Sequence, residues 1–352
     1  MPFDNNPLEK FISNFINVSC TLDEVIEKIN NNKQKILFVI DDNYKLLGSI
    51  TDGDIRRSLL KKDNSINAST IMNANPIFAL EGTDNEELGI LYSSKGIKHI
   101  PILDKENRIT DVQVLEDSSR RNYKNSVFLL AGGFGKRLYP LTKKVPKPLL
   151  NIGSKPILEK IIRKLISHGF SRFFISLHYK SNMIIDHLGD GSQWGIKIHY
   201  IIEEEPLGTA GSLTLIDREL KHPLIVMNAD LLTTFDFESF LEFHNSNNVS
   251  ASMCVRQYQF NVPFGVVHSN NEQVIRIEEK PVNNFLINAG IYLINPDVIS
   301  NMTRGKYMDM PDLIQDLINN GKKVSSFPIY EYWLDIGTKD QYQIAIDNEK
   351  MS

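Results

Sequence analysis

The stretch Leu129-Leu-Ala-Gly132-Gly133-Phe-Gly135-Lys136-Arg137-Leu138 decides the fold of the larger part of the chain. It follows an apolar run of strand length, Val127–Leu130, and so belongs at the carboxyl end of that strand, where α/β sheets place ligands. Its closely spaced glycines let the backbone approach a polyphosphate, and Lys136 and Arg137 add positive charge. The glycine spacing is neither that of a Walker A loop nor that of a dinucleotide-binding fingerprint. The stretch therefore predicts a phosphate-binding loop of another kind.

Strand-like and helical patterns alternate on the carboxyl side of this loop. Short β-rich runs occupy Val127–Leu130, Phe173–Leu177, Ile196–Ile202 and Leu224–Met227, and helical patterns occupy Leu158–Ile166, Ile184–Leu188, Ser212–Ile216 and Phe237–Phe243. Such alternation is typical of a mostly parallel sheet with helices on both faces. The expected fold class is α/β, with a Rossmann-like mixed, mostly parallel sheet.

The chain before residue 122 contains an internal repeat. The segment Ile36–Leu46 lines up with His99–Ile109 at an offset of 63 residues, and each consists of an apolar run, a polar turn and a second apolar stretch. A helical pattern precedes each segment, so two β-α-β-β units form one small α/β module. The polar segment 118–125 predicts a linker between a domain of residues 1–120 and a domain of residues 121–352.

Composition excludes several classes of protein. The 352 residues include 39 basic and 43 acidic ones, a net charge of −4, which gives no reason to expect nucleic acid or a membrane surface as partner. Cys20 and Cys254 are the two cysteines, too few for a disulfide framework or a cysteine zinc site. With no secretory signal and no apolar run long enough to span a bilayer, a cytoplasmic protein is expected.

Further motifs follow the glycine loop in a fixed order. They are Leu138–Thr142, Pro146-Lys-Pro-Leu149, Glu203–Ser212, Leu224–Asp230, Glu278–Pro281 with Ile287–Tyr292, and Trp333–Thr338. Over residues 125 to 350 the chain resembles the sugar-1-phosphate nucleotidyltransferases, which join a nucleoside triphosphate to a sugar 1-phosphate and release pyrophosphate. The resemblance implies a GT-A-like nucleotidyltransferase domain.

The resemblance also implies a role for each motif. Arg137 and Lys147 would be the catalytic cations, and Asp230 and Asp335 would hold Mg²⁺. The nucleotide-binding residues would be Leu130, Ala131, Gly132, Gly133, Gly135, Glu203, Gly208, Thr209 and Ala210. The sugar phosphate would be bound by Gly265, Glu279, Lys280, Asn288 and Gly290. In the loop before residue 212, the glycine and threonine are expected to leave free N–H groups at a helix start.

Base and sugar are less strongly indicated. A carboxylate can accept both N1–H and N2–H of guanine, so Glu203 is the expected base reader and GTP the expected nucleotide, although an acidic loop that contacts no base would look the same. The fusion of this domain to the small α/β module of residues 1–120 resembles the arrangement in guanylyltransferases that act on glucosamine 1-phosphate in legionaminic acid synthesis. This implies a role in bacterial surface-glycan or nonulosonic acid biosynthesis. The alternatives are mannose or heptose 1-phosphate, and a uridylyl- or thymidylyltransferase.

The first module, residues 8 to 118, resembles a tandem pair of CBS domains. The resemblance implies an adenine nucleotide at Thr51 and Asp54, whereas the simpler alternative is that Thr51 or Asp52 caps the helix Ile55–Leu60. A homodimer or higher homo-oligomer is expected, because CBS pairs commonly associate. A different class stays open: a nucleotide sensor with a vestigial catalytic domain.

Overall fold

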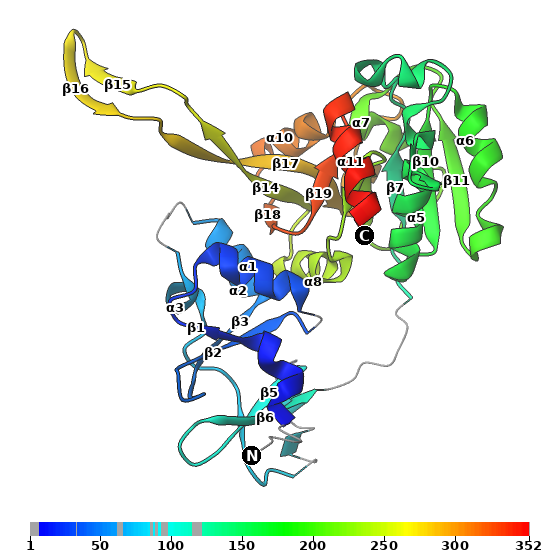
Figure 1. Cartoon of the computed structure of the whole chain (residues 1–352). Coiled ribbons are helices and arrows are strands. Elements are labelled where there is room, and N and C mark those ends of the chain that lie inside the picture. Colours follow the sequence, from blue (N-terminus) through cyan, green and yellow to red (C-terminus); the bar gives the residue numbers. More distant parts are fainter. Residues whose placement is uncertain are drawn as a thin grey trace. The chain divides into compact units, whose positions relative to one another are not determined.

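The computed structural model describes residues 7–32, 34–61, 66–84, 87–88, 91–92, 98–114 and 122–351. The chain divides into two compact units, Met1–Ser119 and Arg120–Ser352 (Figure 1). Within the described ranges, no helix is long and apolar enough to cross a membrane.

The larger unit is built on a seven-stranded sheet with the order β11-β10-β7-β12-β17-β14-β18. In this sheet β17 runs antiparallel to both its neighbours, and the other neighbouring pairs are parallel, which confirms the mixed, mostly parallel sheet. Each of the four predicted strands ends within one residue of the end of an observed strand. The bounds are β7 (Val127–Leu130), β10 (Arg172–Leu177), β11 (Lys197–Ile202), β12 (Leu224–Asn228), β14 (Ala251–Asn261), β17 (Val282–Ile294) and β18 (Val324–Ile329).

Helices cover both faces of this sheet. Because side chains alternate along a strand, Val127 and Leu129 pack into one hydrophobic cluster and Phe128 into the other. The first cluster takes α5 (Ile157–Ser167), α6 (Ser181–Leu188), α8 (Phe237–Asn247) and α11 (Lys339–Met351), and the second takes α9 (Pro296–Ser300) and α10 (Met310–Asn319). The predicted helix at Ser212–Ile216 is instead a short α7 (Gly208–Gly211) followed by a 3₁₀ helix, Ser212–Leu215.

Short elements complete the unit. Three 3₁₀ turns (Lys136–Leu138, Leu141–Lys143 and Lys147–Leu149) follow β7, and another spans Ser192–Trp194. Two small antiparallel pairs are β8 (Asn151–Ile152) with β9 (Lys155–Pro156), and β13 (Leu231–Thr233) with β19 (Trp333–Asp335).

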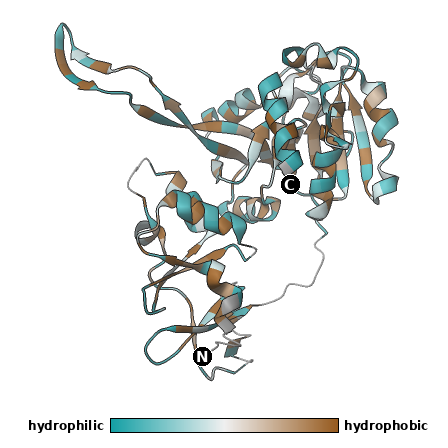
Figure 2. Cartoon of the chain, viewed as in Figure 1, coloured by the Kyte–Doolittle hydropathy of each residue, from teal (hydrophilic) through white to brown (hydrophobic). Residues whose placement is uncertain are grey.

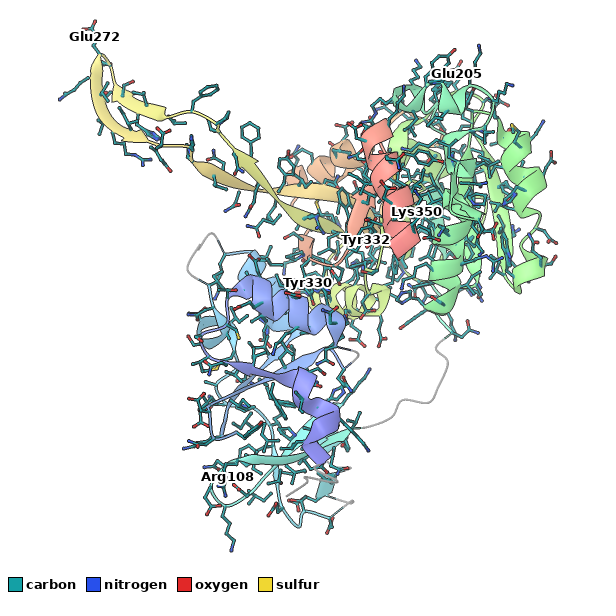
Figure 3. The ribbon with its side chains drawn as sticks, viewed as in Figure 1. Arg108, Glu205, Glu272, Tyr330, Tyr332 and Lys350 are labelled. Carbon is teal, nitrogen blue, oxygen red and sulfur yellow. The ribbon has the colours of Figure 1, made fainter. Side chains whose placement is uncertain are left out.

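A long two-stranded arm leaves the sheet. Strands β14 and β17 continue their pairing beyond it as far as Asn261 and Val282, and the hairpin of β15 (Val266–Asn270) and β16 (Gln273–Glu278) follows (Figure 1). Residues 256–287 are called the β-ribbon below. Glu272, in the turn between β15 and β16, lies at its far end (Figure 3). Apolar and polar residues both occur along the β-ribbon (Figure 2).

The smaller unit holds two three-stranded sheets of the same topology. In each sheet the first pair of strands is parallel and the second antiparallel. The elements are a 3₁₀ helix (Pro7–Asn14), β1 (Phe15–Asn17), α1 (Leu22–Asn31), β2 (Ile36–Ile40), β3 (Leu46–Thr51), α2 (Asp52–Leu59), α3 (Ala68–Ile71), β4 (Ala79–Leu80), β5 (His99–Leu103) and β6 (Ile109–Val114). The second predicted helix falls partly outside the described residues.

The two copies of the repeat share the same irregularities in their strand pairing and turns. A bulge interrupts the pairing at Val39/Ile40 in one sheet and at Ile102/Leu103 in the other, 63 residues later in the chain. In both turns an aspartate carboxylate, Asp41 or Asp104, accepts hydrogen bonds from the N–H groups two and four residues on. These matched irregularities confirm the internal repeat.

Candidate functional site

The candidate site lies where four neighbouring parallel strands end. The glycine loop follows β7, His178 follows β10, Glu203 follows β11, and Asp230 stands two residues after β12. Because these strands are parallel, their carboxyl ends meet at one edge of the sheet, as the sequence predicts. Two adjoining pockets of about 380 and 310 Å³ open there, and both are lined by Leu130, Gly133, Phe134 and Asp230.

The glycine loop forms one wall of the larger pocket. Gly135 adopts a left-handed conformation (φ 63°), and a Cβ atom there would lie 2.9 Å from Thr142 Cγ2 and 3.1 Å from Lys147 Cβ. A glycine is therefore needed for the loop to pack against Lys147. The Thr142 hydroxyl donates to the Gly135 carbonyl (2.9 Å), which fixes the turn.

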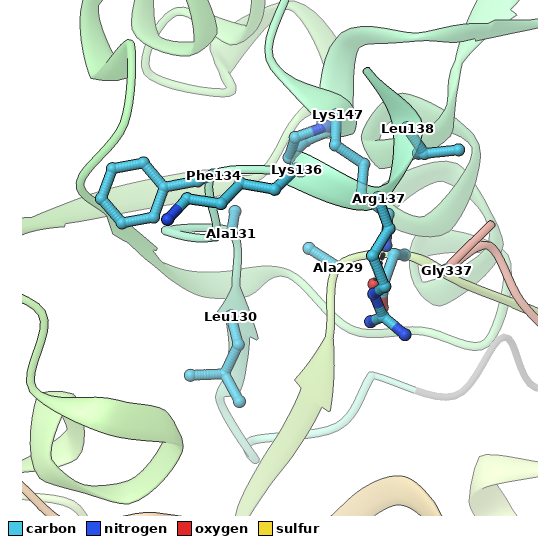
Figure 4. A pocket seen from close by; sticks show the side chains of 13 residues that line it. Leu130, Ala131, Phe134, Lys136, Arg137, Leu138, Lys147, Ala229 and Gly337 are labelled. Carbon is cyan, nitrogen blue, oxygen red and sulfur yellow. Dashed lines mark hydrogen bonds and ion pairs between the residues drawn. The ribbon is translucent and has the colours of Figure 1, made fainter. Parts of the chain in front are cut away.

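Three cations line this pocket. The Lys147 ammonium forms an ion pair with the Asp230 carboxylate. Arg137 is exposed and points toward Gly337, where a Cβ atom would lie 3.3 Å from Arg137 Nη1, and Lys136 lies alongside the Phe134 ring, 5.4 Å from its centre (Figure 4). Arg137 and Lys147 thus face the same cavity, where they can neutralise phosphate charge.

The two predicted metal ligands lie next to each other. The pairing of β13 with β19 sets Leu231 opposite Asp335, and the Ile336 N–H donates to the Asp230 carbonyl (3.0 Å). Asp230 Oδ1 and Asp335 Oδ1 are both buried without a hydrogen-bond partner. Burial, and then the charge of Asp230, raise the pKa of Asp335. Two half-buried carboxylates, each with a buried and unused oxygen, fit a hard divalent cation.

Further metal ligands would come from elsewhere. Among the residues that the structure describes, no group of three or more histidine, cysteine, aspartate or glutamate side chains could hold a metal ion. An ion bound by Asp230 and Asp335 would therefore complete its shell with phosphate oxygens and water, as Mg²⁺ does at many phosphoryl-transfer sites.

Glu203 is buried in the wall of the smaller pocket. Its Oε1 accepts from the Ser176 hydroxyl and its Oε2 from the Leu207 N–H (2.8 Å), while His178 Nδ1 contacts its main-chain oxygen (2.8 Å). Each carboxylate oxygen keeps a second lone pair. Glu203 thus shapes the loop that follows it and can still accept hydrogen bonds from a ligand.

The loop before α7 differs from its expected arrangement. The Thr209 N–H is not free, because it donates to Asp309 Oδ1 (3.0 Å), and the Ala210 N–H donates to the Met308 carbonyl (2.9 Å). The Thr209 N–H is also the main cause that lowers the pKa of Asp309. Gly208 (φ 76°) approaches the same segment so closely that a Cβ atom would lie 2.5 Å from the Met308 carbonyl oxygen. The loop is anchored to the start of α10, and Gly208 and Thr209 still line the smaller pocket.

The predicted sugar-phosphate residues fall into two places. Asn288 and Gly290 lie at the base of the β-ribbon, where Asn288 Oδ1 accepts from the Gly290 N–H (3.0 Å) and Gly290 lies against Asn228. Gly265, Glu279 and Lys280 lie instead in the middle of the β-ribbon, and none of the three lines either pocket. The structure does not bring these three together with the rest of the site.

Sequence reasoning missed three residues of the site. Phe134 lines both pockets, and the sequence feature that could have pointed to it is a large aromatic residue between the glycines of the loop. The Ser176 hydroxyl donates a hydrogen bond to Glu203, and the sequence feature that could have pointed to it is a single hydroxyl side chain in an apolar strand. Asp309, which anchors Thr209, gave no signal because it lies 100 residues away in the chain.

In the smaller unit, helix capping engages both predicted ligand residues. The Thr51 N–H and hydroxyl both donate to Asp54 Oδ2 (2.8 and 2.6 Å), and α2 begins at Asp52. Arg57 adds an ion pair to Asp54 Oδ1 (2.6 Å). This is the capping arrangement that the sequence left as the alternative. Adenine-nucleotide binding stays a prediction.

A mostly parallel sheet whose carboxyl edge carries a glycine loop, a half-buried lysine and two adjacent carboxylates is typical of an α/β protein that binds polyphosphates. Residues 126–350 match the family model of the nucleotidyl transferases, and the chain belongs to this family. Residues 11–61 match the model of the CBS domain, which corresponds to the first copy of the repeat.

Known relatives agree with this family. The chain is 33% identical over 223 residues to mannose-1-phosphate guanyltransferase of Pichia angusta, covering 59% of this chain and 60% of the relative. It thus spans about 60% of the length of the curated relatives it matches. A structure assigned as a Bacillus anthracis glucose-1-phosphate thymidylyltransferase is 25% identical (TM-score 0.52, 64% of this chain and 95% of that one). HddC from Yersinia pseudotuberculosis, complexed with GMP-PN, is 27% identical (TM-score 0.50, 64% and 99%).

Proposed function

We propose that this protein transfers a nucleotidyl group from a nucleoside triphosphate to the phosphate of a hexose 1-phosphate and releases pyrophosphate. The observation that carries the proposal is the gathering of Lys147, Asp230 and Asp335 beside the glycine loop. Both reactants are anions, so the barrier is mainly charge repulsion and misalignment. The sugar phosphate is itself the nucleophile, and the protein needs no covalent one.

Each cation has a place in this reaction. Arg137, at the exposed rim of the larger pocket, would hold the outer phosphates of the nucleotide. Lys147, framed by Pro146 and Pro148, would meet the α-phosphate, where negative charge develops in the transition state. We propose that Asp230 and Asp335 hold Mg²⁺, whose chemistry is to neutralise phosphate charge.

GTP is the proposed nucleotide. Support comes from the guanyltransferase relatives, from the guanine nucleotide analogue in the HddC structure and from the buried Glu203 carboxylate in the smaller pocket. Among sugars, the names of the relatives favour mannose 1-phosphate over the expected glucosamine 1-phosphate. Mannose 1-phosphate is therefore the first substrate to test, with glucosamine and heptose 1-phosphates beside it.

The test is pyrophosphate release with Mg²⁺ across a grid of substrates. GTP, UTP, dTTP, CTP and ATP are crossed with the 1-phosphates of mannose, glucosamine, N-acetylglucosamine, glucose and a heptose, with Asp230→Asn as the inactive control. Turnover with GTP and one sugar phosphate is expected. Turnover with UTP or dTTP instead would overturn the choice of base, and no turnover from folded protein would favour the nucleotide-sensor alternative.

A further inference from the structure

One wall of the smaller pocket is built from a helix that is too short to hold its own shape. Pro206, Gly208 and Thr209 line this pocket, and the last two belong to α7, a helix of four residues. The first four N–H groups of a helix have no partner within it, so every N–H group of α7 depends on a partner from outside. Leu207, at the N-cap position, has no side-chain oxygen that could accept from them. The shape of the wall must therefore be fixed by another part of the chain.

The start of α10, beside α7 in the larger unit, supplies the missing acceptor (Figure 1). Asp309 stands at the N-cap position of α10, but its side chain does not cap its own helix. Its Oδ1 accepts instead from the N–H (3.0 Å) and the hydroxyl (3.2 Å) of Thr209. In return, the Thr209 hydroxyl accepts from the Met310 N–H (2.7 Å) in the first turn of α10. Each helix is thus capped by a side chain of the other.

Main-chain contacts reinforce this reciprocal capping. The Met308 carbonyl accepts from the N–H groups of Ala210 (2.9 Å) and Gly211 (3.0 Å). The Met308 N–H donates to the Leu207 carbonyl (3.0 Å). The two segments lie so close together that a Cβ atom at Gly211 would overlap the Lys306 carbonyl oxygen. The pocket wall and the segment before α10 therefore hold each other in one conformation.

The Asp309 carboxylate is itself held in place. Its Oδ2 accepts from the Tyr307 hydroxyl (2.8 Å), so both of its oxygens are bound by the protein. Asp309 lines neither of the two pockets, whereas Thr209 lines the smaller one. Any effect of Asp309 on a ligand must therefore pass through Thr209 and the wall to which it belongs.

We infer that Asp309 is a positioning residue, which holds Gly208 and Thr209 in the conformation that receives a nucleoside triphosphate. This inference rests on the proposed function, since it takes the smaller pocket as part of the nucleotide site. On the pocket side, Glu203 Oε2 accepts from the Leu207 N–H (2.8 Å), so the wall is fixed between two carboxylates. Without Asp309 the nucleotide must order the wall as it binds, which lowers its affinity.

The first test is calorimetric binding of GTP with Mg²⁺ to the full chain, or of whichever nucleotide of the substrate grid the wild type binds best. Asp309→Ala should weaken binding about 10- to 100-fold. Asp312→Ala, which removes the same charge from an exposed position in the first turn of α10, should stay within about twofold of the wild type. Asp309→Asn keeps an oxygen that can accept from Thr209 and should stay within about fivefold. Equal binding by Asp309→Ala and Asp312→Ala, or an Asp309→Asn variant as weak as Asp309→Ala, would overturn the inference.

The second test is a double-mutant cycle between the two capping side chains. Thr209→Val keeps the shape of the side chain but removes the hydroxyl that joins Asp309 to the Met310 N–H. Alone, this change should weaken nucleotide binding about three- to tenfold, and in a chain that already carries Asp309→Ala it should weaken binding less than about twofold. Equal losses in both backgrounds would show that the two side chains act independently and would contradict the inference.

Steady-state kinetics separate positioning from a role in stability alone. Positioning predicts that Asp309→Ala raises the KM for the nucleotide about 10- to 100-fold and changes kcat less than about threefold. A lower kcat with an unchanged KM would mean fewer folded molecules and would overturn the inference. If the wild type binds a nucleotide but turns over no sugar phosphate, the proposed function fails while the binding measurements still decide the role of Asp309. A wild type that binds none of the five nucleotides would overturn both.

Discussion

Two carboxylates define the candidate site at the scale of single residues. Asp230 and Asp335 each keep one buried oxygen without a hydrogen bond, and burial, followed by the charge of Asp230, raises the pKa of Asp335. Holding like charges together costs stability in the absence of a cation, which is the usual compromise of a functional site. The Lys147 ammonium offsets part of this cost through its ion pair with Asp230.

Replacing Asp335 with asparagine should raise the stability of the metal-free protein and lower its activity. The variant removes one of two repelling charges, so the Tm of the metal-free protein should rise by about 1–3 °C, while turnover should fall at least about 100-fold. Mg²⁺ should raise the Tm of the wild type and leave that of the variant nearly unchanged. Thermal unfolding with and without Mg²⁺ measures both effects, and Asp217→Asn, at an exposed site, is the control. Equal Mg²⁺ responses would exclude Asp335 as a ligand.

Glu203→Gln tests the reading of the base. The oxygen of glutamine can still accept from the Leu207 N–H, so the loop should keep its shape. The NH₂ group of glutamine cannot accept a hydrogen bond, so the variant loses the charged pair of oxygens that could receive both N1–H and N2–H of guanine. The preference for GTP over UTP, measured as the ratio of kcat/KM values, should fall about 10- to 100-fold. An unchanged ratio would show that Glu203 serves the loop alone.

At the scale of elements, the inner parallel strands were predictable and the pairings that complete the site were not. Strands such as β7 and β10 are continuous apolar runs between polar loops, because both of their faces are buried. The three-residue strands β13 and β19 are too short to show a period, so the meeting of Asp230 and Asp335 was implied only by motif resemblance. The course of the β-ribbon depends on long-range pairing that local sequence does not encode.

His244 connects three elements and should make stability depend on pH. It lies buried on α8, with Nδ1 2.9 Å from Ser252 Oγ on β14 and Nε2 2.9 Å from Asn295 Oδ1 after β17. Burial lowers the pKa of His244 in the folded protein. The unfolded chain therefore takes up the proton first, and stability should fall as pH drops below about 6.5.

The measurement is urea unfolding at pH 7.5 and pH 5.5. The loss of stability between the two pH values should be smaller in His244→Gln than in the wild type. His222→Gln, at an exposed position, should keep the wild-type loss. A His244→Gln variant with an unchanged pH dependence would assign the effect to other groups.

At the scale of the whole molecule, the chain combines two units with separate interiors. Two hydrophobic clusters consist only of described residues of the larger unit, and two others only of described residues of the smaller unit. Calorimetry of the full chain should therefore show two unfolding transitions. GTP with Mg²⁺ should raise the transition of the larger unit by several degrees at saturating ligand. A single cooperative transition for the full chain would contradict this division.

The pairing of β13 with β19 also sets the order in which the site appears during translation. The glycine loop and Asp230 are synthesised before β14 to β18, and Asp335 is synthesised after them. A nascent chain thus carries the nucleotide-side pocket residues long before the carboxylate pair exists. Because Asp230 and Asp335 come together only when β19 pairs with β13, a growing or prematurely terminated polypeptide lacks the complete candidate site, which forms with one of the last strands to be made.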